Sequence, residues 1–275
     1  MRKKNIIFSL LTLLLVSFVV AGCSSKQTSE KIAVGTPTLF FHGFGSNYHA
    51  EEQMVNAAKK AGVTKESIIA DVTPENKVIL KGKFSKNVKN PIVEVNLQDN
   101  QNGSSKNVLA VIKKLQANYK FKKINLVGHS FGNLMIANYI NENYADKKMP
   151  VINKVVSIAG HYNGWLGEAV GRSGKIVDPK TGKPDKFAPG FKQLLGLRKH
   201  YPKQIKVLNI YGDKKDGSKG DGSVSVASAQ TYRYLINNRA RSYQEVEITG
   251  KMAQHSKLHE NKEVDKILIK FLWGK

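Results

Sequence analysis

The sequence predicts an α/β protein whose central, mostly parallel sheet has helices on both faces. Two observations support this prediction. Apolar segments of strand length alternate with segments of helical periodicity along most of the 275 residues, which indicates βαβ units. The strand segments are nearly continuous apolar runs, as expected for parallel strands covered on both faces. With 41% hydrophobic residues, the chain can form the core of one large domain.

The N-terminus has the layout of a secretory signal. The cations of MRKKN precede the apolar run IIFSLLTLLLVSFVV, which is followed by the small residues Ala21 and Gly22 and then Cys23. That run is shorter than the roughly 20 residues that a membrane-spanning helix needs. We therefore expect a signal peptide at 1–22, with an uncleaved anchor helix as the alternative. Both interpretations place the rest of the chain outside the cytoplasmic membrane.

Cys23 is the single cysteine of the chain, which excludes an intramolecular disulfide. The segment Val20-Ala21-Gly22-Cys23 resembles the lipobox of bacterial lipoproteins. This resemblance implies cleavage before Cys23 and a diacylglycerol on its sulfur, so we expect a lipid anchor on the extracellular face of the cell membrane. The polar segment at 23–31 is interpreted as a flexible tether, and the folded domain is expected at 32–275.

Strands and helices are expected to alternate from residue 32 onward. The expected strands lie at 36–41, 77–100, 124–127, 152–160, 205–213 and 242–249, and the second range is interpreted as a hairpin whose later strand enters the sheet. The expected helices lie at 49–62, 104–120, 131–144 and 261–275. Ser104 or Ser105 could cap the helix that follows.

The pattern breaks between residues 161 and 204. This stretch is rich in Gly, Lys and Pro and has only short apolar groups. A long irregular stretch inside a compact domain is usually functional. We interpret it as a lid-like insertion between the sixth and seventh strands.

A sharp strand-to-helix corner at residues 128–132 carries the strongest functional signal. Gly128-His129-Ser130-Phe131-Gly132 resembles G-x-S-x-G, the nucleophile elbow of α/β-hydrolases. The glycines leave room at a tight turn, and the serine is held exposed above the sheet edge. The N-terminus of the following helix favours negative charge there. Ser130 is therefore the candidate nucleophile, and a serine in an ordinary turn is the alternative.

The acid of a Ser-His-Asp triad is expected after the strand at 205–213, in the family order Ser, Asp, His. Asp221-Gly222-Ser223-Val224 resembles the D-G-x-V segment that carries the acid in many lipases, which favours Asp221. Asp213 is the second choice and could instead cap a turn. Asp216 is a further candidate. This acidic cluster could bind Ca²⁺, but its spacing fits no known loop, so we expect no metal and no cofactor.

The base is expected in the loop after the last strand, which contains His255 and His259. His255 is favoured because it lies in the loop proper and is followed five residues later by Glu260, a spacing often seen in this family. His259 adjoins the expected helix and could be a capping or surface residue. His129 is expected to pack beneath the corner. Surface or support roles are expected for His49, His161 and His200.

The segment Phe40-Phe41-His42-Gly43-Phe44-Gly45 resembles the H-G-x-G segment of lipases and esterases. In those enzymes the amide after His-Gly points at the developing oxyanion, which implies the amide of Phe44 here. The second donor implied is the amide of Phe131, the residue after the nucleophile. His42 is expected to support the loop.

These motifs form part of a wider resemblance, which covers Ile32 to the C-terminus. The chain resembles α/β-hydrolases and, more narrowly, the cell-surface hydrolases of Gram-positive bacteria grouped as domain of unknown function 915. The segments that carry the resemblance are FFHGFGSN, NPIVEVNLQDN, INLVGHSFGN, DGSVSVASA and HSKLHENKEVDKILIKFLW. The resemblance implies a serine hydrolase but no particular substrate. The chain departs from many relatives at Asn133, where a second glycine is usual, and a larger side chain there could narrow the pocket.

The resulting hypothesis is a lipid-anchored carboxylic-ester hydrolase that forms an acyl-enzyme. We expect Phe44, Phe131, Trp165 and parts of the insertion to line a pocket for a small-molecule or lipid ester. The alternatives are an acyltransferase, thioesterase or peptidase with the same triad, or a binding lipoprotein on a hydrolase scaffold. The net charge of +23 indicates a solvated cationic surface or attraction to an anionic surface polymer or membrane. The sequence has no nucleic-acid-binding module.

Overall fold

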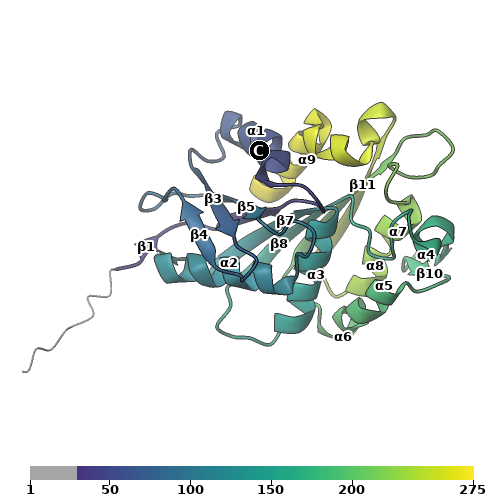
Figure 1. The fold of residues 1–275 in the computed structure, drawn as a ribbon, viewed down its shortest axis with the longest axis horizontal. Helices are drawn as coiled ribbons and strands as arrows, with labels where there is room; N and C mark the ends of the chain where they lie inside the picture. The colour runs from purple at the N-terminus through teal and green to yellow at the C-terminus, as the bar shows by residue number, and fades with distance from the viewer. Residues whose placement is uncertain (1–29) are drawn as a thin grey trace, which may run out of the picture. The chain divides into compact units, whose positions relative to one another are not determined.

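An eight-stranded sheet lies at the centre of the fold (Figure 1). The computed structural model describes residues 30–275. The expected signal peptide, Cys23 and most of the expected tether lie outside the described residues. Residues Lys31–Lys275 form one compact unit.

The sheet has the strand order β12-β11-β8-β7-β2-β5-β3-β4. All neighbouring strands are parallel except β3 and β4, which confirms the predicted α/β class. The strands are β2 (Thr38–Phe41), β3 (Ser67–Val72), β4 (Val78–Lys81), β5 (Ile92–Leu97), β7 (Lys123–His129), β8 (Val151–Ile158), β11 (Lys206–Asp213) and β12 (Ser242–Thr249). The inner strands β2, β5 and β7 are almost fully buried, as their continuous apolar sequences predict.

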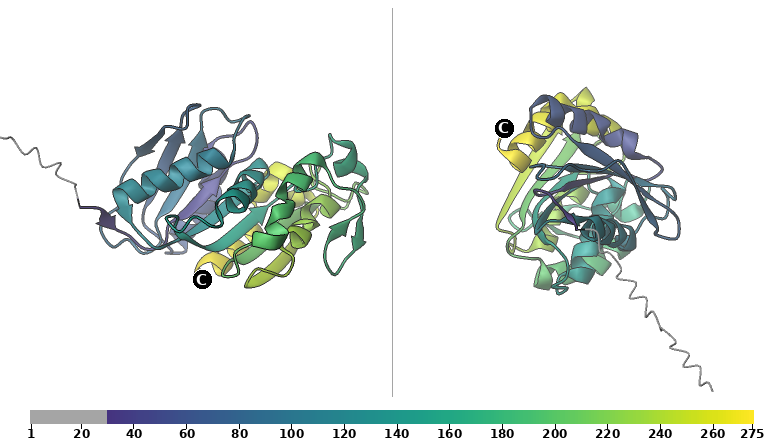
Figure 2. Two further views of the ribbon diagram at one scale, coloured as in Figure 1. Left: turned by 90° about the horizontal axis from the view of Figure 1, so that it is seen from below. Right: turned by 90° about the vertical axis from the view of Figure 1, so that its left-hand side faces the viewer.

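Helices cover both faces of the sheet. Helices α1 (Glu52–Lys60) and α9 (Lys262–Trp273) pack on one face, where their apolar side chains share a buried cluster with strand residues such as Val127. Helices α2 (Ser105–Asn118) and α3 (Phe131–Asn143) pack on the other face. The two layers are separated by the sheet in Figure 1 and can be followed from two further sides in Figure 2. The sheet therefore has the doubly covered arrangement that its sequence predicts.

Two helix starts show how the sequence sets these boundaries. Ser104 caps α2 in a capping box with Asn107, so the first of the two candidate serines is the cap. Asn261 caps α9, and its side chain accepts a hydrogen bond from the amide of Glu263 at 2.8 Å. Such caps satisfy amides that have no partner within the helix.

The predicted hairpin at 77–100 is wrong. β4 pairs in antiparallel fashion with β3, whereas β5 enters the sheet parallel to β2 and β3. The turn between β3 and β4 contains Asn76 at φ 63°, a conformation that Asn tolerates better than most residues. β3 was not predicted because its sequence SIIADV is short and includes a polar Asp71, which binds Asn96 and Gln98 of the neighbouring chain segment.

The stretch between β8 and β11 forms an insertion of short elements. β8 and β11 are the sixth and seventh strands of the main sheet, so the predicted place of the insertion is confirmed. The insertion contains α4 (Ala169–Ser173), β9 (Ile176–Asp178), β10 (Lys183–Pro184), α5 (Pro189–Gln193), η2 (Leu194–Gly196) and α6 (Leu197–His200). Two unpredicted helices, α7 (Val226–Gln230) and α8 (Tyr232–Ile236), follow β11.

The remaining elements are short. β1 (Ile32–Ala33) pairs with β6 (Tyr119–Lys120) in a separate parallel pair. The 3₁₀ helix η1 (Tyr48–Glu51) leads into α1, and η3 (Lys251–Ala253) and η4 (His255–Glu260) connect β12 to α9. These last connections place the loop that contains the candidate base.

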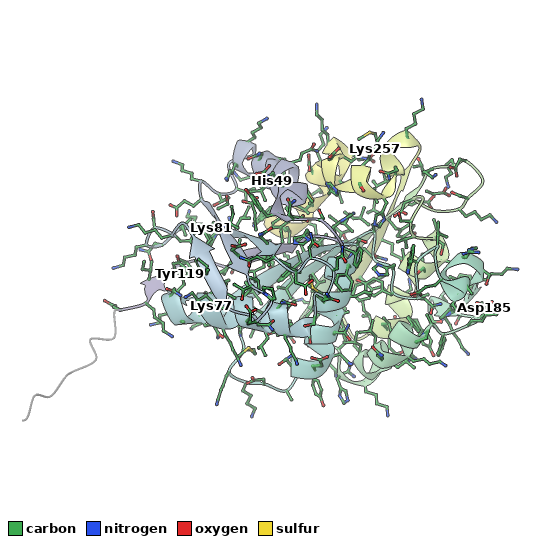
Figure 3. The ribbon with its side chains drawn as sticks, in the orientation of Figure 1. His49, Lys77, Lys81, Tyr119, Asp185 and Lys257 are labelled. Carbon is green, nitrogen blue, oxygen red and sulfur yellow. The ribbon has the colours of Figure 1, made fainter. Side chains whose placement is uncertain are left out.

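The surface carries lysines on several elements rather than in one block. Lys77 and Lys81 are exposed at the two ends of β4, and Lys257 is exposed in η4 (Figure 3). Within residues 30–275, none of the helices is both long enough and apolar enough to cross a membrane.

Candidate active site

The candidate residues lie beyond the carboxyl ends of the parallel strands, at one edge of the sheet. Ser130 follows β7, Asp221 lies in the segment after β11, and His255 lies after β12. The loop with Phe44 follows β2. Ligand sites of open α/β sheets occur at this edge because the loops that leave parallel strands converge there.

Ser130 has an unusual backbone conformation. Its φ is 51° and its ψ is −117°, and its amide donates a 2.9 Å hydrogen bond to the carbonyl of Ile158 in the neighbouring strand. A non-glycine residue with positive φ is uncommon and strained, and such strain concentrates at functional sites. The corner therefore holds Ser130 in a fixed position at the sheet edge.

The two flanking glycines are required by close contacts. A Cβ atom on Gly128 would lie 2.6 Å from Oδ1 of Asn133, and one on Gly132 would lie 2.2 Å from the carbonyl oxygen of Phe41. Gly132 therefore makes room for the end of β2. Any side chain at Gly132 would push α3 away from that strand.

Asn133 does not narrow the cavity as the departure from the family pattern suggested. Its side chain is buried in the corner, where its amide group donates to the carbonyls of Ser130 at 3.1 Å and Ile158 at 2.8 Å. It joins the elbow to β8. The larger residue thus stabilises the corner and stays out of the cavity wall.

His255 lies next to Ser130. Its Nε2 is 2.9 Å from Oγ of Ser130, and its Nδ1 is 2.8 Å from Oδ2 of Asp221. A carboxylate can only accept, so the bond to Asp221 places a proton on Nδ1 and leaves Nε2 free to accept the serine proton. This continuous chain of hydrogen bonds is the geometry that proton abstraction from a serine requires.

Asp221 is fixed on both sides. Its Oδ1 accepts hydrogen bonds from the amides of Ser223 at 2.8 Å and Val224 at 2.7 Å, while Oδ2 faces His255. The amide of His255 also donates to the carbonyl of Asp221 at 2.9 Å. Asp221 is almost fully buried, so its contact with the imidazole is shielded from water.

The alternative acids and base lie elsewhere. Asp213 accepts hydrogen bonds from the amide and the Nζ of Lys215, both at 2.9 Å, so it caps a turn as its alternative interpretation predicted. Asp216 pairs with Lys214 on the surface. His259 packs edge-on against His129, with ring centroids 4.8 Å apart, and makes no hydrogen bond to Ser130 in the described part of the chain. Of the candidate acids and bases, the structure brings only Asp221 and His255 into a hydrogen-bonded chain with the serine.

Two further histidines support the site from below. The Nε2 of buried His129 donates a 3.0 Å hydrogen bond to the carbonyl of His255, so the residue before the serine holds the main chain of the base. His42 accepts from the amide of Leu97 at 3.1 Å and donates to the carbonyl of Gly43 at 2.8 Å. Burial lowers the pKa of both imidazoles, which keeps them neutral.

The amides of Phe44 and Phe131 have no hydrogen-bond acceptor among residues 30–275. Their loops are adjacent, because a Cβ atom on Gly43 would lie 3.1 Å from Cβ of Ser130, and the two phenyl rings pack edge-to-face at 6.3 Å. Two free amides beside a serine are the donors that an oxyanion hole needs.

A cavity of about 630 Å³ opens beside Ser130. Its wall includes Phe44, Phe131 and Trp165, which the sequence placed there. It also includes Leu134, His161, Tyr162, Phe191, Ser223 and Val224. The sequence predicted only a surface or support role for His161. Its position at the end of a strand, beside the insertion, was the one signal that could have placed it in the cavity wall.

No group of three or more His, Cys, Asp or Glu side chains within the described part of the chain has the arrangement of a metal site. Ser130, His255 and Asp221, with two amides and an adjacent cavity, can perform nucleophilic acyl transfer.

Comparisons with known proteins agree with the fold. The model of a family described as "Alpha/beta hydrolase of unknown function (DUF915)" matches residues 25–275. The crystal structure of the product of gene lin2722 from Listeria innocua is similar, with 24% identity and a TM-score of 0.80, and the match covers 88% of this chain and 95% of that one. A proposed cell surface hydrolase from Lactobacillus plantarum is 18% identical with a TM-score of 0.68, and the match covers 86% and 90%. The comparison with curated proteins gave no significant match.

Proposed function

Since this chain belongs to the α/β-hydrolase family of unknown function DUF915, we propose that it is a serine hydrolase that cleaves carboxylic esters through an acyl-enzyme intermediate. The observation that carries the proposal is the chain of hydrogen bonds from Ser130 Oγ through His255 to Asp221, at 2.9 Å and 2.8 Å. In this proposal Ser130 is the nucleophile, His255 the general base and Asp221 the acid that orients it.

The first step forms the acyl-enzyme. His255 accepts the Ser130 proton at Nε2 while Oγ attacks the ester carbonyl carbon. Asp221 keeps the other proton on Nδ1 and stabilises the imidazolium that results. His255 then donates its new proton to the departing alkoxide, which leaves as an alcohol.

Charge on the tetrahedral intermediate needs stabilisation by fixed donors. The amides of Phe44 and Phe131 fill this role in the proposal, because both are adjacent to Ser130 and neither has an acceptor among the described residues. Losing one such donor typically raises the barrier by about 2.7–4 kcal/mol.

Water completes the cycle. A water molecule attacks the acyl carbon, gives a proton to His255 and releases a carboxylic acid, and the imidazolium returns that proton to Ser130 Oγ. The cavity walls are largely apolar, with Phe44, Phe131, Leu134 and Phe191 among them, which favours an ester with an apolar group.

We further propose that the protein is anchored outside the cytoplasmic membrane by a lipid on Cys23. This proposal depends on the sequence of the first 23 residues, which lie outside the described part of the chain. Globomycin, which blocks lipoprotein signal processing, tests it. Accumulation of the uncleaved precursor is expected, and normal maturation in its presence would contradict the lipid anchor.

A series of p-nitrophenyl esters of increasing chain length tests the catalytic proposal. Wild-type protein is expected to hydrolyse at least one member of the series, and Ser130→Ala and His255→Ala are expected to reduce kcat by about 10⁴-fold or more. His259→Ala is the matched control, because His259 lies close by without contacting Ser130. Full loss in His259→Ala with activity retained in His255→Ala would overturn the assignment of the base.

A further inference from the structure

The cavity beside Ser130 has walls of two chemical kinds. One wall consists of apolar side chains from the β2 loop, α3 and the insertion, with Phe44, Leu134 and Phe191 as examples. The other wall comes from the loop after β8 and the acid loop, and it contains the polar side chains of His161 and Ser223. An ester with only alkyl groups would leave the polar wall without a hydrogen-bonding partner.

A strained turn delivers His161 to this wall. Ala159, directly after β8, has a φ of 53°, and its amide donates a 2.9 Å hydrogen bond to the carbonyl of Ile210. A non-glycine residue in this conformation is strained. Gly160 follows, and a Cβ atom there would lie 2.5 Å from the Tyr162 ring. The backbone is therefore constrained at both of the residues that directly precede His161.

The imidazole of His161 has no hydrogen-bond partner within residues 30–275. Its Nδ1 is shielded from solvent and unpaired, although the residue contributes to the cavity wall. Burial is the main cause that lowers the pKa of His161 to about 4, with His255 lowering it further and Asp221 opposing the shift. His161 is thus neutral at physiological pH, and a neutral imidazole offers one donor and one acceptor.

Ser223 lines the same cavity as His161. Its amide donates to Asp221 at 2.8 Å and its carbonyl accepts from the amide of Leu166 at 2.8 Å, so the acid loop and the 161–166 turn are joined. The hydroxyl of Ser223 has no partner among the residues that the structure describes. His161 and Ser223 therefore both line the cavity and both have unused hydrogen-bonding capacity.

Neither residue is needed for the acyl-transfer steps themselves. His255 already bonds both Ser130 and Asp221, so the site has its base without His161. An unpaired buried polar atom such as Nδ1 of His161 is destabilising unless a ligand supplies the missing partner, whereas the partly exposed Ser223 hydroxyl can exchange water for such a partner. A substrate oxygen is the partner that both a neutral imidazole and a hydroxyl would accept.

We propose that His161 and Ser223 form a polar subsite that hydrogen-bonds a hydroxyl group of the ester substrate, close to the scissile bond. The inference rests on the proposed ester hydrolysis and deepens it. The preferred substrates are then hydroxylated esters, in which an apolar part occupies the wall around Leu134 and Phe191 while the hydroxyl group binds His161 and Ser223. Simple alkanoyl alkyl esters are poorer substrates.

Pairs of isosteric esters that differ by one hydroxyl group test this subsite. On the acyl side, p-nitrophenyl 3-hydroxybutanoate is compared with p-nitrophenyl 3-methylbutanoate. On the alcohol side, 2-hydroxyethyl butanoate is compared with propyl butanoate, with acid release followed by pH-stat. Wild-type protein is expected to prefer the hydroxylated member of at least one pair by about tenfold or more in kcat/KM, because the buried polar groups of the site stay unpaired with the other member.

His161→Phe keeps a ring of similar size but removes both nitrogens, and it is expected to bring this ratio close to one. Ser223→Ala is expected to reduce the ratio in the same direction. Leu134→Val is the matched control: it alters the apolar wall and is expected to change kcat/KM for both esters of a pair by the same factor, leaving the ratio intact. Labelling by a fluorophosphonate probe reports that each variant retains a folded site.

A wild-type ratio below about twofold in both pairs would overturn the subsite, as would a ratio unchanged in both His161→Phe and Ser223→Ala. Those outcomes leave the proposed ester hydrolysis standing, because the esters are still cleaved. Absence of turnover for every ester would instead overturn the proposed function, and the subsite with it.

Discussion

The corner at residues 128–132 and the insertion at 161–204 both line the cavity, but different interactions hold them in place. The corner is fixed by the backbone, through the register of β7 with β8 and the hydrogen bond from Ser130 to Ile158. The insertion is fixed by buried apolar side chains, such as Phe191 and Leu194, and by polar side chains that bond to carbonyls and amides. Asn163, for example, donates to Lys186 and accepts from the amide of Ala188.

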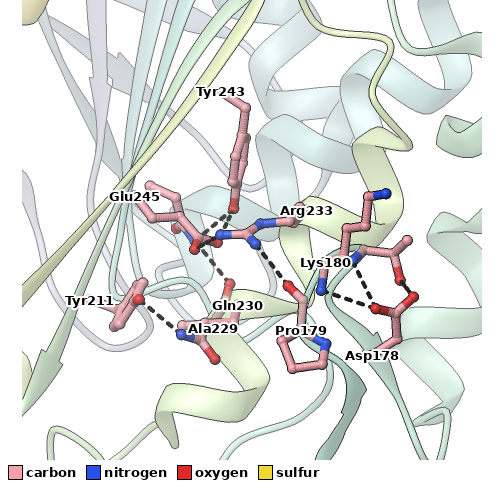
Figure 4. A network of polar contacts seen from close by, with 11 residues as sticks. Asp178, Pro179, Lys180, Tyr211, Ala229, Gln230, Arg233, Tyr243 and Glu245 are labelled. Carbon is pink, nitrogen blue, oxygen red and sulfur yellow. Dashed lines mark hydrogen bonds and ion pairs between the residues drawn. The ribbon is translucent and has the colours of Figure 1, made fainter.

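Arg233 of α8 gives a second example. Its guanidinium donates to the carbonyl of Pro179 in the insertion at 2.8 Å and pairs with Glu245 of β12 (Figure 4). It thereby connects the β9–β10 hairpin to the edge strand of the sheet. The comparison teaches that the position of the candidate nucleophile depends on backbone geometry, whereas the insertion's part of the cavity wall depends on side-chain packing and scattered polar contacts.

The largest effect is expected from the acid. Asp221→Asn should lower kcat for p-nitrophenyl butanoate by about 10⁴-fold, because an amide at this position favours the wrong tautomer of His255. Asp213→Asn is the matched control, since Asp213 bonds Lys215 and not the base. Steady-state kinetics of both purified variants makes the comparison. Equal losses in the two variants would show that the acid is misassigned.

A glycine pair contrasts the two regions directly. Gly132→Ala places a Cβ atom 2.2 Å from the Phe41 carbonyl oxygen, whereas Gly190→Ala in the insertion meets nothing within 4 Å. We expect Gly132→Ala to lower the free energy of unfolding by about 3 kcal/mol or more and Gly190→Ala to change it by at most about 1 kcal/mol. Chemical denaturation measures both values. Equally small changes in the free energy of unfolding for Gly132→Ala and Gly190→Ala would contradict the close approach of Gly132 to the Phe41 carbonyl oxygen.

Glu51 of η1 carries a buried carboxyl group. Neither of its oxygens has a partner among the described residues, and burial, together with Glu94, raises the pKa of Glu51 to about 8. The folded protein therefore binds this proton more tightly than the unfolded chain, and stability is lost as the pH rises from about 4.5 to about 8. Above that range this group contributes no further change.

Glu51→Gln replaces the protonated carboxyl by a neutral isostere and removes this loss. Relative to wild type, the free energy of unfolding of the variant should rise by at most about 1.4 kcal/mol per pH unit across that window. Denaturation at several pH values measures this difference. Glu52→Gln is the control, because Glu52 is partly exposed and pairs with His49. If the free energy of unfolding changed with pH in the same way for wild type and Glu51→Gln, ionisation of Glu51 would not be the cause of the loss of stability.

The smallest effect is expected in the insertion. Asn163→Ala leaves the carbonyl of Lys186 and the amide of Ala188 without partners, at a cost of about 1–2 kcal/mol. Limited proteolysis should then cleave within 161–204 faster than in wild type, while the rest of the domain resists. Ser173→Ala removes only a local bond to Ala169 and should leave the cleavage rate as it was. Equal rates for Asn163→Ala and wild type would mean that the insertion is held by other contacts.

The same contrast explains what could be predicted from the sequence. The corner, its strand and its helix were predictable because periodicity and G-x-S-x-G are local patterns, and Asp221 and His255 followed from short loop motifs. β3 was not predicted because its sequence SIIADV is short and includes the polar Asp71. α7 and α8 were not predicted because each has only five residues, too few to show helical periodicity. The polar wall at His161 was unpredictable because it forms only when the loops after β8 and β11 meet.

Identification of the residue that a fluorophosphonate probe modifies tests the central claim most directly. Wild-type protein is treated with the probe and digested, and the modified peptide is sequenced by mass spectrometry. The account predicts a single phosphonylated residue, Ser130, with labelling lost in Ser130→Ala and strongly slowed in His255→Ala. Folded protein that stays unlabelled, or that is labelled at another serine, would contradict it.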